Sequence, residues 1–172
     1  AFLIEVFARG FRTGDQIERA TGMPFLGLVP ELNPKGRRNL HPADEVMRDP
    51  SGLYAEAIRS LQGHVLLARV GERHARVVLV TSSQPGEGKT ATAASLARIF
   101  AMGGYRTVLI DADMHNPTVH EALGMRRLPG LADLLVGRAA FQHVIRRDTA
   151  SHAHVIQAGT PISNTTAALA SS

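Results

Sequence analysis

The sequence of 172 residues contains no cysteine and no tryptophan, and aromatic residues make up only 5% of it. The absence of cysteine excludes disulfide bonds and metal sites held by thiolates. The net charge is +4, but the aromatics do not interleave with the arginine doublets, so we expect no nucleic acid among the partners. The apolar runs are far shorter than the roughly 20 residues that a membrane-spanning helix needs. With 44% hydrophobic and 20% charged residues, the composition is typical of a globular protein.

The most informative stretch of the chain runs from Val77 to Thr92 and reads VVLVTSSQPGEGKTAT. Its start, Val77–Val80, is apolar and mostly β-branched, which predicts a buried strand. A turn rich in glycine, proline and serine follows, and residues 90–102 continue as a helical pattern of small residues. A strand, a loop, Gly-Lys-Thr and a helix in this order are the arrangement of a phosphate-binding P-loop. The sequence therefore predicts that the chain binds a nucleoside triphosphate.

The residue types in this loop suit phosphate binding. Gly86 and Gly88 allow backbone N–H groups to converge on one point, and the following helix adds its free N–H groups. Lys89 supplies a positive charge for the outer phosphates, and the Thr90 hydroxyl is a hard oxygen ligand for Mg²⁺. Ser83 stands where the common motif G-x-x-x-x-G-K-[ST] has glycine, which indicates a variant P-loop. The predicted nucleotide-binding residues are Ser83, Gln84, Pro85, Gly86, Glu87, Gly88, Lys89, Thr90 and Ala91.

A second chemical feature follows the predicted strand 107–110, which ends in Asp111-Ala112-Asp113. In a parallel α/β sheet, ligands collect at the carboxyl ends of the strands. Carboxylates at that edge beside a triphosphate can hold Mg²⁺ or accept a proton from an attacking hydroxyl. Taken alone, these carboxylates would only be polar residues that end a strand. Beside a P-loop, we predict that Lys89, Asp111 and Asp113 are catalytic, that Thr90, Asp111 and Asp113 bind the metal, and that the cofactors are ATP or ADP with Mg²⁺.

The remaining elements predict an α/β fold, a P-loop NTPase with a mainly parallel sheet flanked by helices. Predicted helices cover 1–9, 14–20 (with Thr13 as cap), 53–70, 118–123, 130–137 and 141–145. Predicted strands cover 25–29, 77–80, 107–110 and 154–157, and residues 33–50 are expected to be a mobile connection. The long helix is expected to begin at Asp49-Pro50 and to bury Leu53, Ala57, Leu61 and Val65. The start, which lacks Met, and the end in AALASS predict a piece of a longer chain with an incomplete C-terminal part.

Several segments together resemble a known family, the bacterial tyrosine kinases. Thr81–Thr90 and Val108–Pro117 resemble its Walker A and Walker A′ motifs, and Gly130–Gly137 and Val155–Gly159 follow in the same order. These kinases are the cytoplasmic ATPase domains of exopolysaccharide co-polymerases, which control polysaccharide chain length. Arg9–Pro30 resembles the juxtamembrane segment after the second transmembrane helix of that family. The resemblance divides the chain into a lead-in and linker, 1–50, and the N-terminal part of a kinase domain, 51–172.

The resemblance implies an ATP-dependent protein-tyrosine (auto)kinase that regulates exopolysaccharide or capsule biosynthesis and export. It places the protein at the cytoplasmic face of the inner membrane, with a transmembrane co-polymerase portion in the same or a partner chain. By the same resemblance, Lys89 and Thr90 bind phosphate and Mg²⁺, while Asp111 and Asp113 share metal coordination and activation of the attacking tyrosine. The family's Walker B strand and tyrosine-rich tail are expected beyond Ser172. We therefore expect little turnover from this part of the chain, and an exposed apolar sheet edge.

Two departures from the family pattern leave alternatives open. The stretch 56–62 (EAIRSLQ) resembles the family's E-x-x-R-x-x-R oligomerisation helix, but Gln62 replaces the last arginine, and His115 stands where arginine usually follows the D-x-D. Self-association through the 51–70 helix is therefore an open prediction, and a non-catalytic or ATPase-only nucleotide switch is one alternative. A partition-type ATPase is another. Those proteins usually carry a lysine early in the loop, where this chain has Ser83-Gln84.

Overall fold

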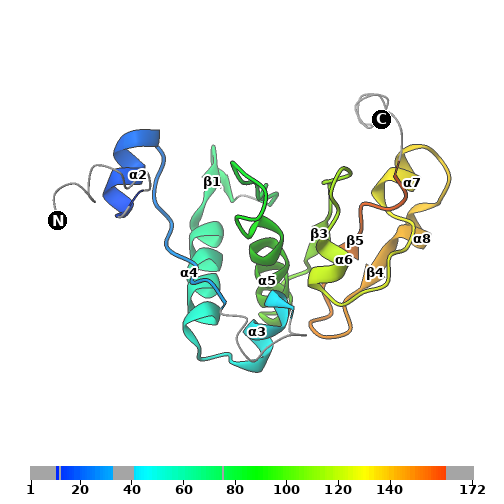
Figure 1. The fold of residues 1–172 in the computed structure, drawn as a ribbon, viewed down its shortest axis with the longest axis horizontal. Helices are drawn as coiled ribbons and strands as arrows, with labels where there is room; N and C mark the ends of the chain where they lie inside the picture. The colour runs from blue at the N-terminus through cyan, green and yellow to red at the C-terminus, as the bar shows by residue number, and fades with distance from the viewer. Residues whose placement is uncertain (1–10, 12, 33–40, 75, 162–172) are drawn as a thin grey trace.

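The computed structural model describes residues 11, 13–32, 41–74 and 76–161 (Figure 1). The helices α4 (Leu53–Leu67) and α5 (Lys89–Met102) lie side by side, and a three-stranded sheet with the short helices α6 to α8 lies on the other side of α5. Two apolar clusters hold these parts together, one between α3, α4 and α5 and the other between α3, α5, α6 and the sheet. The helix predicted for 1–9 lies outside the described residues. None of the described helices has the length and hydropathy needed to cross a bilayer.

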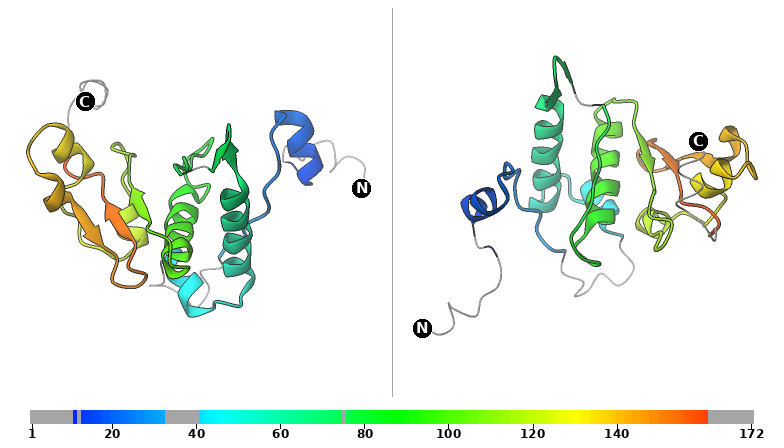
Figure 2. Two further views of the ribbon diagram at one scale, coloured as in Figure 1. Left: turned by 180° about the vertical axis from the view of Figure 1, so that it is seen from behind. Right: turned by 90° about the horizontal axis from the view of Figure 1, so that it is seen from above.

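The N-terminal helix, α2 (Gly14–Thr21), confirms the predicted one: Thr13 is its N-cap, and Gly22 ends it with a φ of 69°. It lies beyond α4 in both views of Figure 2, and none of its residues is buried. The strand predicted for 25–29 is wrong, because this segment is irregular. The Glu18 carboxylate accepts the N–H of Phe25 at 2.8 Å, and Gly27 has a φ of 138°, so the chain does not present a regular edge for pairing.

Helix α3 (Pro42–Arg48) lies within the stretch predicted as a mobile connection, and that prediction is wrong for 41–50. Pro42 at the first helical turn favours helix initiation, and Ala43 and Val46 are buried in the two clusters. The few apolar residues of this stretch are separated by charged ones, so the sequence shows only a weak helical pattern. In the structure, these apolar residues pack against α5. Residues 33–40 lie outside the described part of the chain. The helix α3 therefore covers one side of α5, upstream of the division predicted at residue 50.

Helix α4 begins at Leu53, after the N-cap Gly52, and not at Asp49-Pro50. Those two residues form a turn instead, in which the Gly52 N–H donates to the Asp49 carbonyl at 3.1 Å. Leu53, predicted to be buried, is 78% exposed, whereas Leu61 and Val65, predicted with it, are partly buried against the core. The residues on the buried face are Tyr54, Ala55, Ile58, Leu61 and Val65. The helix ends at Leu67, since the chain turns there into a small hairpin of β1 (Arg69–Val70) and β2 (Arg73–His74), which the sequence analysis missed.

Helix α5 confirms the helix predicted after the P-loop, and Gly103 ends it. It is the central helix of the fold, because its side chains enter both apolar clusters: Ala94 lies in one, and Leu96 and Ile99 lie in the other. The Tyr54 hydroxyl of α4 also hydrogen-bonds the buried Ser95 hydroxyl at 2.9 Å. Helix α5 therefore packs against both halves of the described fold.

The strand predicted at Val77–Val80 is wrong for this structure. The segment is irregular, and Val77 and Leu79 are 90% and 86% exposed. A strand requires a neighbour whose backbone completes its hydrogen bonds, and among the described residues no strand pairs with 76–80. The segment nevertheless exposes the apolar side chains that led to the prediction, although it is not the edge of a sheet.

The sheet has the order β3-β5-β4, with β3 at Val108–Ile110, β4 at Ile145–Arg147 and β5 at His154–Ile156. β3 and β5 are parallel, with Val108 opposite His154, and β4 is antiparallel to β5. The predicted α/β class is confirmed, but the described sheet is mixed because of β4, whose Arg146-Arg147 broke the apolar pattern. Helices α6 (Val119–Ala122), α7 (Leu131–Leu135) and α8 (Phe141–Val144) confirm the short helices predicted there.

Candidate functional site

The loop between 82 and 88 folds around a carboxylate of its own. Gly86 and Gly88 have φ angles of 84° and 85°, which favour glycine, and Gly88 is the N-cap of α5. The Glu87 carboxylate accepts the backbone N–H groups of Ser83 at 2.8 Å and Gln84 at 3.1 Å. The hydrogen bond from Gln84, followed by those from Ser83, lowers the pKa of Glu87. Two amides of the loop thus already bind an anionic oxygen, which is the chemistry that a phosphate requires.

Lys89 and Asp113 meet across the site. The Lys89 Nζ lies 3.3 Å from the Asp113 Oδ2, and both side chains are about one-third exposed, at 29% and 33%. The other oxygen of Asp113 accepts the N–H of Asn116 at 2.9 Å. The hydrogen bond from Asn116, and then the lysine, lower the pKa of Asp113. The structure therefore brings together the loop lysine and a carboxylate that were both predicted as catalytic, although 24 positions separate Lys89 from Asp113 in the sequence.

Asp111 has a different environment from Asp113. It is only 5% exposed, and its two oxygens accept the N–H groups of Asp113 at 3.1 Å and Val119 at 3.2 Å. Burial raises the pKa of Asp111, and these two hydrogen bonds act against that rise. Its carboxylate holds the loop 111–119 in shape and connects the end of β3 to the start of α6. Of the two carboxylates predicted as catalytic, Asp113 is the more accessible.

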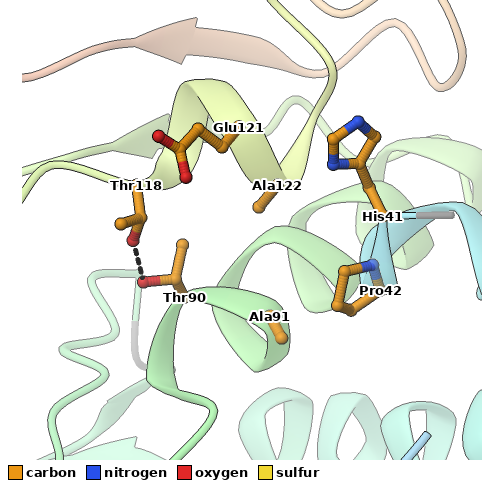
Figure 3. A pocket seen from close by; sticks show the side chains of 7 residues that line it. All are labelled: His41, Pro42, Thr90, Ala91, Thr118, Glu121 and Ala122. Atoms are coloured by element: carbon orange, nitrogen blue, oxygen red, sulfur yellow. Dashed lines mark hydrogen bonds between the residues drawn. The ribbon is translucent and has the colours of Figure 1, made fainter. Parts of the chain in front are cut away.

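Thr90 faces α6 and not Asp111. Its hydroxyl lies 2.8 Å from the hydroxyl of Thr118, the N-cap of α6. The two threonines line one end of a pocket of about 270 Å³, which lies between the start of α3, the first turn of α5 and α6 (Figure 3). The side chains that line it are His41, Pro42, Thr90, Ala91, Thr118, Glu121 and Ala122.

The donor set fits a hard divalent cation. A hydroxyl from the start of α5 and carboxylates from the loop after β3 offer only oxygen, which Mg²⁺ prefers. Within the described residues, no cluster of three or more His, Asp or Glu side chains is assembled for a metal ion. Thr90 and Asp113 are each bonded to another side chain in this structure, so a metal would have to share or replace these contacts.

Thr118 and His41 line the site but were missed by the sequence analysis. Thr118 follows Asn116-Pro117 and precedes α6, so a helix-cap pattern marked its position but not its contact with Thr90. His41 lies in the stretch 33–50 that was predicted as a mobile connection, and nothing in the sequence relates it to α5. Both contacts arise from packing between elements that are distant in the chain.

The loop geometry, the helix that follows it and the surrounding α/β fold define a P-loop nucleotide-binding domain. A family model described as the CobQ/CobB/MinD/ParA nucleotide binding domain matches residues 78–155. Tyrosine-protein kinase YwqD of Bacillus subtilis (strain 168) is 36% identical over 126 residues, which are 73% of this chain and 52% of YwqD. The putative tyrosine-protein kinase EpsB of Ralstonia solanacearum is 34% identical over 158 residues, 86% of this chain and 20% of EpsB.

A solved structure described as the BceF tyrosine kinase domain has the same fold, with a TM-score of 0.77 and 29% identity, covering 94% of this chain and 67% of that one. The predicted resemblance is thus confirmed: the chain carries a P-loop nucleotide-binding domain and is homologous to proteins named as bacterial tyrosine kinases. The matched part spans about half the length of YwqD and a fifth of EpsB.

Proposed function

We propose that this chain is the nucleotide-binding part of an ATP-dependent protein-tyrosine (auto)kinase that regulates exopolysaccharide or capsule biosynthesis and export. The observation that carries the proposal is the contact between Lys89, at the start of α5, and Asp113, after β3. A phosphate-binding cation and an accessible carboxylate at one point are what transfer of a phosphoryl group to a hydroxyl requires. The homology to proteins named as tyrosine kinases supports the choice of tyrosine as acceptor.

The proposed roles follow from the contacts of each residue. The backbone N–H groups of 83–91 and the Lys89 ammonium bind the phosphates of ATP or ADP, and the Glu87 carboxylate must release the amides of Ser83 and Gln84. Thr90 and Asp113 hold Mg²⁺, with Asp111 as a further oxygen donor from the same loop. Bound Mg²⁺ would neutralise charge on the phosphates.

The reaction that we propose moves the γ-phosphoryl group of ATP to a tyrosine oxygen and leaves ADP. The proton of the tyrosine hydroxyl goes to a carboxylate, for which Asp113 is better exposed than Asp111. Because the Lys89 ammonium is close to that carboxylate, it favours the ionised form that can accept a proton.

The surroundings of the site are part of the proposal. We propose that residues 1–50 are the lead-in and linker, that 51–172 are the first part of the kinase domain, and that the protein acts at the cytoplasmic face of the inner membrane. Its partner is the transmembrane co-polymerase portion, in the same or another chain. The packing of α3 on α5 supports a direct connection from the lead-in to the nucleotide site.

Phosphotransfer in the full-length protein tests this proposal. We expect incorporation of phosphate from ATP into tyrosine, with Mg²⁺ required, and its loss in Lys89→Ala and Asp113→Asn. A matched control is Asp15→Asn in α2, where the same charge is removed at an exposed position remote from the site. Phosphotyrosine formation that survives Lys89→Ala would overturn the kinase assignment.

A nucleotide switch without kinase activity is the second candidate. It is favoured by Glu56 and Arg59 on α4, which are both exposed and form no ion pair with each other among the described contacts. The Arg59 guanidinium donates to the Pro50 carbonyl at 2.5 Å. Charge reversal at both positions should weaken self-association of the full-length protein if α4 is the interface. ATP-dependent dimerisation without phosphotyrosine would favour the switch.

A further inference from the structure

The hydroxyl of Thr118 has an unusual use for a helix N-cap residue. A threonine at this position normally accepts an N–H group from the first turn of its helix. Here the Thr118 side chain makes no cap hydrogen bond, and the N–H of Val119, the first residue of the helix, donates to the Asp111 carboxylate at 3.2 Å. The Thr118 hydroxyl is thus left to pair with the Thr90 hydroxyl, 2.8 Å away on α5 (Figure 3). The N-cap residue of α6 is therefore in direct contact with Thr90, the proposed metal ligand.

The chemistry of a hydroxyl ligand indicates which of the two hydroxyls donates the hydrogen bond when a metal ion is bound. When a threonine oxygen gives a lone pair to a divalent cation, its remaining polar function is the O–H, which needs an acceptor. The Thr118 oxygen lies within hydrogen-bond distance of Thr90 and is partly buried, so water competes poorly for the same place. Such an acceptor fixes the rotation of the O–H and turns the oxygen lone pairs away from α6. Groups that orient a metal ligand in this way typically change metal affinity by about 10- to 100-fold.

Thr118 is itself held firmly in place. Pro117 precedes it and fixes one backbone angle, and the bond between Val119 and Asp111 ties the following residue to the end of β3. Asp113, in the same loop, contacts Lys89. The loop 111–119 therefore contacts both phosphate- and metal-directed side chains at the start of α5.

We propose that Thr118 is a positioning residue of the metal–nucleotide site. Its hydroxyl oxygen accepts a hydrogen bond from the Thr90 hydroxyl and so orients the Thr90 oxygen toward Mg²⁺. This inference rests on the proposed function, because it assigns Thr118 to the same nucleotide site. A purely structural contact between α5 and α6 would affect stability without any effect specific to the metal. The two roles therefore differ in whether a substitution at Thr118 alters the effect of Mg²⁺ on nucleotide affinity.

The test compares Thr118→Val with Thr118→Ser in the full-length protein. Valine keeps the shape of threonine but has no acceptor, whereas serine keeps the acceptor. Calorimetric titration with ADP, with and without Mg²⁺, gives the factor by which Mg²⁺ increases affinity. We expect Thr118→Val to reduce this factor by about tenfold or more, with Mg²⁺-free affinity within about twofold of wild type, and Thr118→Ser to restore it to within about threefold.

Controls separate this inference from stability and from the proposed function. Thr149→Val, at an exposed turn position, should leave the Mg²⁺ factor unchanged. In a Thr90→Val background, Thr118→Val should have no further effect, because the oriented hydroxyl is gone. An unchanged Mg²⁺ factor in Thr118→Val, or equal losses with and without Mg²⁺, would overturn the role of Thr118 alone. Absence of any Mg²⁺-dependent binding in the wild type would overturn the proposed function, and this inference with it.

Discussion

Lys89 at the start of α5 and Asp113 after β3 form an ion pair across the proposed nucleotide site, with 3.3 Å between Nζ and Oδ2. The lysine proposed to bind the outer phosphates thus also contacts a carboxylate. Nucleotide binding must either break this contact or add a cation that neutralises Asp113. The pair explains why a metal ion and a nucleotide are expected to bind together here.

The first prediction concerns the charge of Asp113. Asp113→Asn removes a negative charge that repels phosphate, so Mg²⁺-free ADP should bind about fivefold more tightly, a change of about 1 kcal/mol. The increase in affinity caused by Mg²⁺ should become smaller, because one metal ligand is weakened. Calorimetric titration measures both quantities, and Asp15→Asn serves as a charge-matched control. Weaker Mg²⁺-free binding in Asp113→Asn would contradict this account.

The second prediction concerns a buried ion network behind the site. Arg98 of α5 is 2% exposed, and its Nε donates to the Asp148 carboxylate at 2.9 Å, while a further nitrogen of Arg98 bonds Asp44 of α3. Arg98→Met leaves the Asp148 carboxylate buried without its cation, and we expect the free energy of unfolding to fall by about 3 kcal/mol. Urea denaturation measures the change. A loss below about 0.5 kcal/mol would mean that this network does not stabilise the fold.

The third prediction is a pH dependence that arises from the same pair. Burial acts to raise the pKa of Asp148, but hydrogen bonds from Arg98 and Ser151 outweigh it, so the pKa lies below its ordinary value. A carboxyl whose pKa is lowered by folding stabilises the folded state above its unfolded-state pKa, near 4. This contribution is lost as the pH falls through the lower, folded-state pKa. Unfolding free energies between pH 7 and pH 2 should therefore fall less steeply at the acid end in Asp148→Asn, and identical slopes would contradict the assignment.

The fourth prediction concerns the apolar segment 76–80. Val77 and Leu79 are 90% and 86% exposed. A segment with exposed apolar side chains and an unpaired backbone favours association between molecules. Val77→Lys with Leu79→Lys should weaken concentration-dependent self-association of this chain by about tenfold or more, as measured by sedimentation velocity, because added charge opposes edge pairing. A wild-type chain that stays monomeric at high concentration would show that the segment 76–80 does not mediate self-association.

The parts of the fold that could be predicted are those whose signals are local. The helix after Gly88 and the strand before Asp111 follow from patterns of neighbouring residues, and both are present. The segment 77–80 was predicted wrongly because a strand also needs a partner, which no local pattern reveals. Helix α3 was missed for a related reason, since its few apolar residues become a helix by packing on α5.

The candidate site shows the same division. The loop 83–90 and the carboxylates 111 and 113 could be proposed from the sequence, because phosphate and metal chemistry restricts the residue types at a P-loop and at a strand end. Thr118 was not found, because its contact with Thr90 joins the starts of two helices 28 residues apart. The difference in accessibility between Asp111 and Asp113 arises in the folded loop, where backbone N–H groups bind the Asp111 carboxylate.

Calorimetric titration of this chain with ADP and ATP, with and without Mg²⁺, compared with Lys89→Ala, tests the central claim most directly. The account predicts binding that Mg²⁺ strengthens and that Lys89→Ala reduces by about 100-fold or more, since the phosphates lose their main cationic partner. A circular-dichroism melt of the same samples establishes that both proteins are folded. Nucleotide binding by a folded Lys89→Ala variant at wild-type affinity, or no binding by the folded wild type, would contradict the assignment of 83–91 as the nucleotide site.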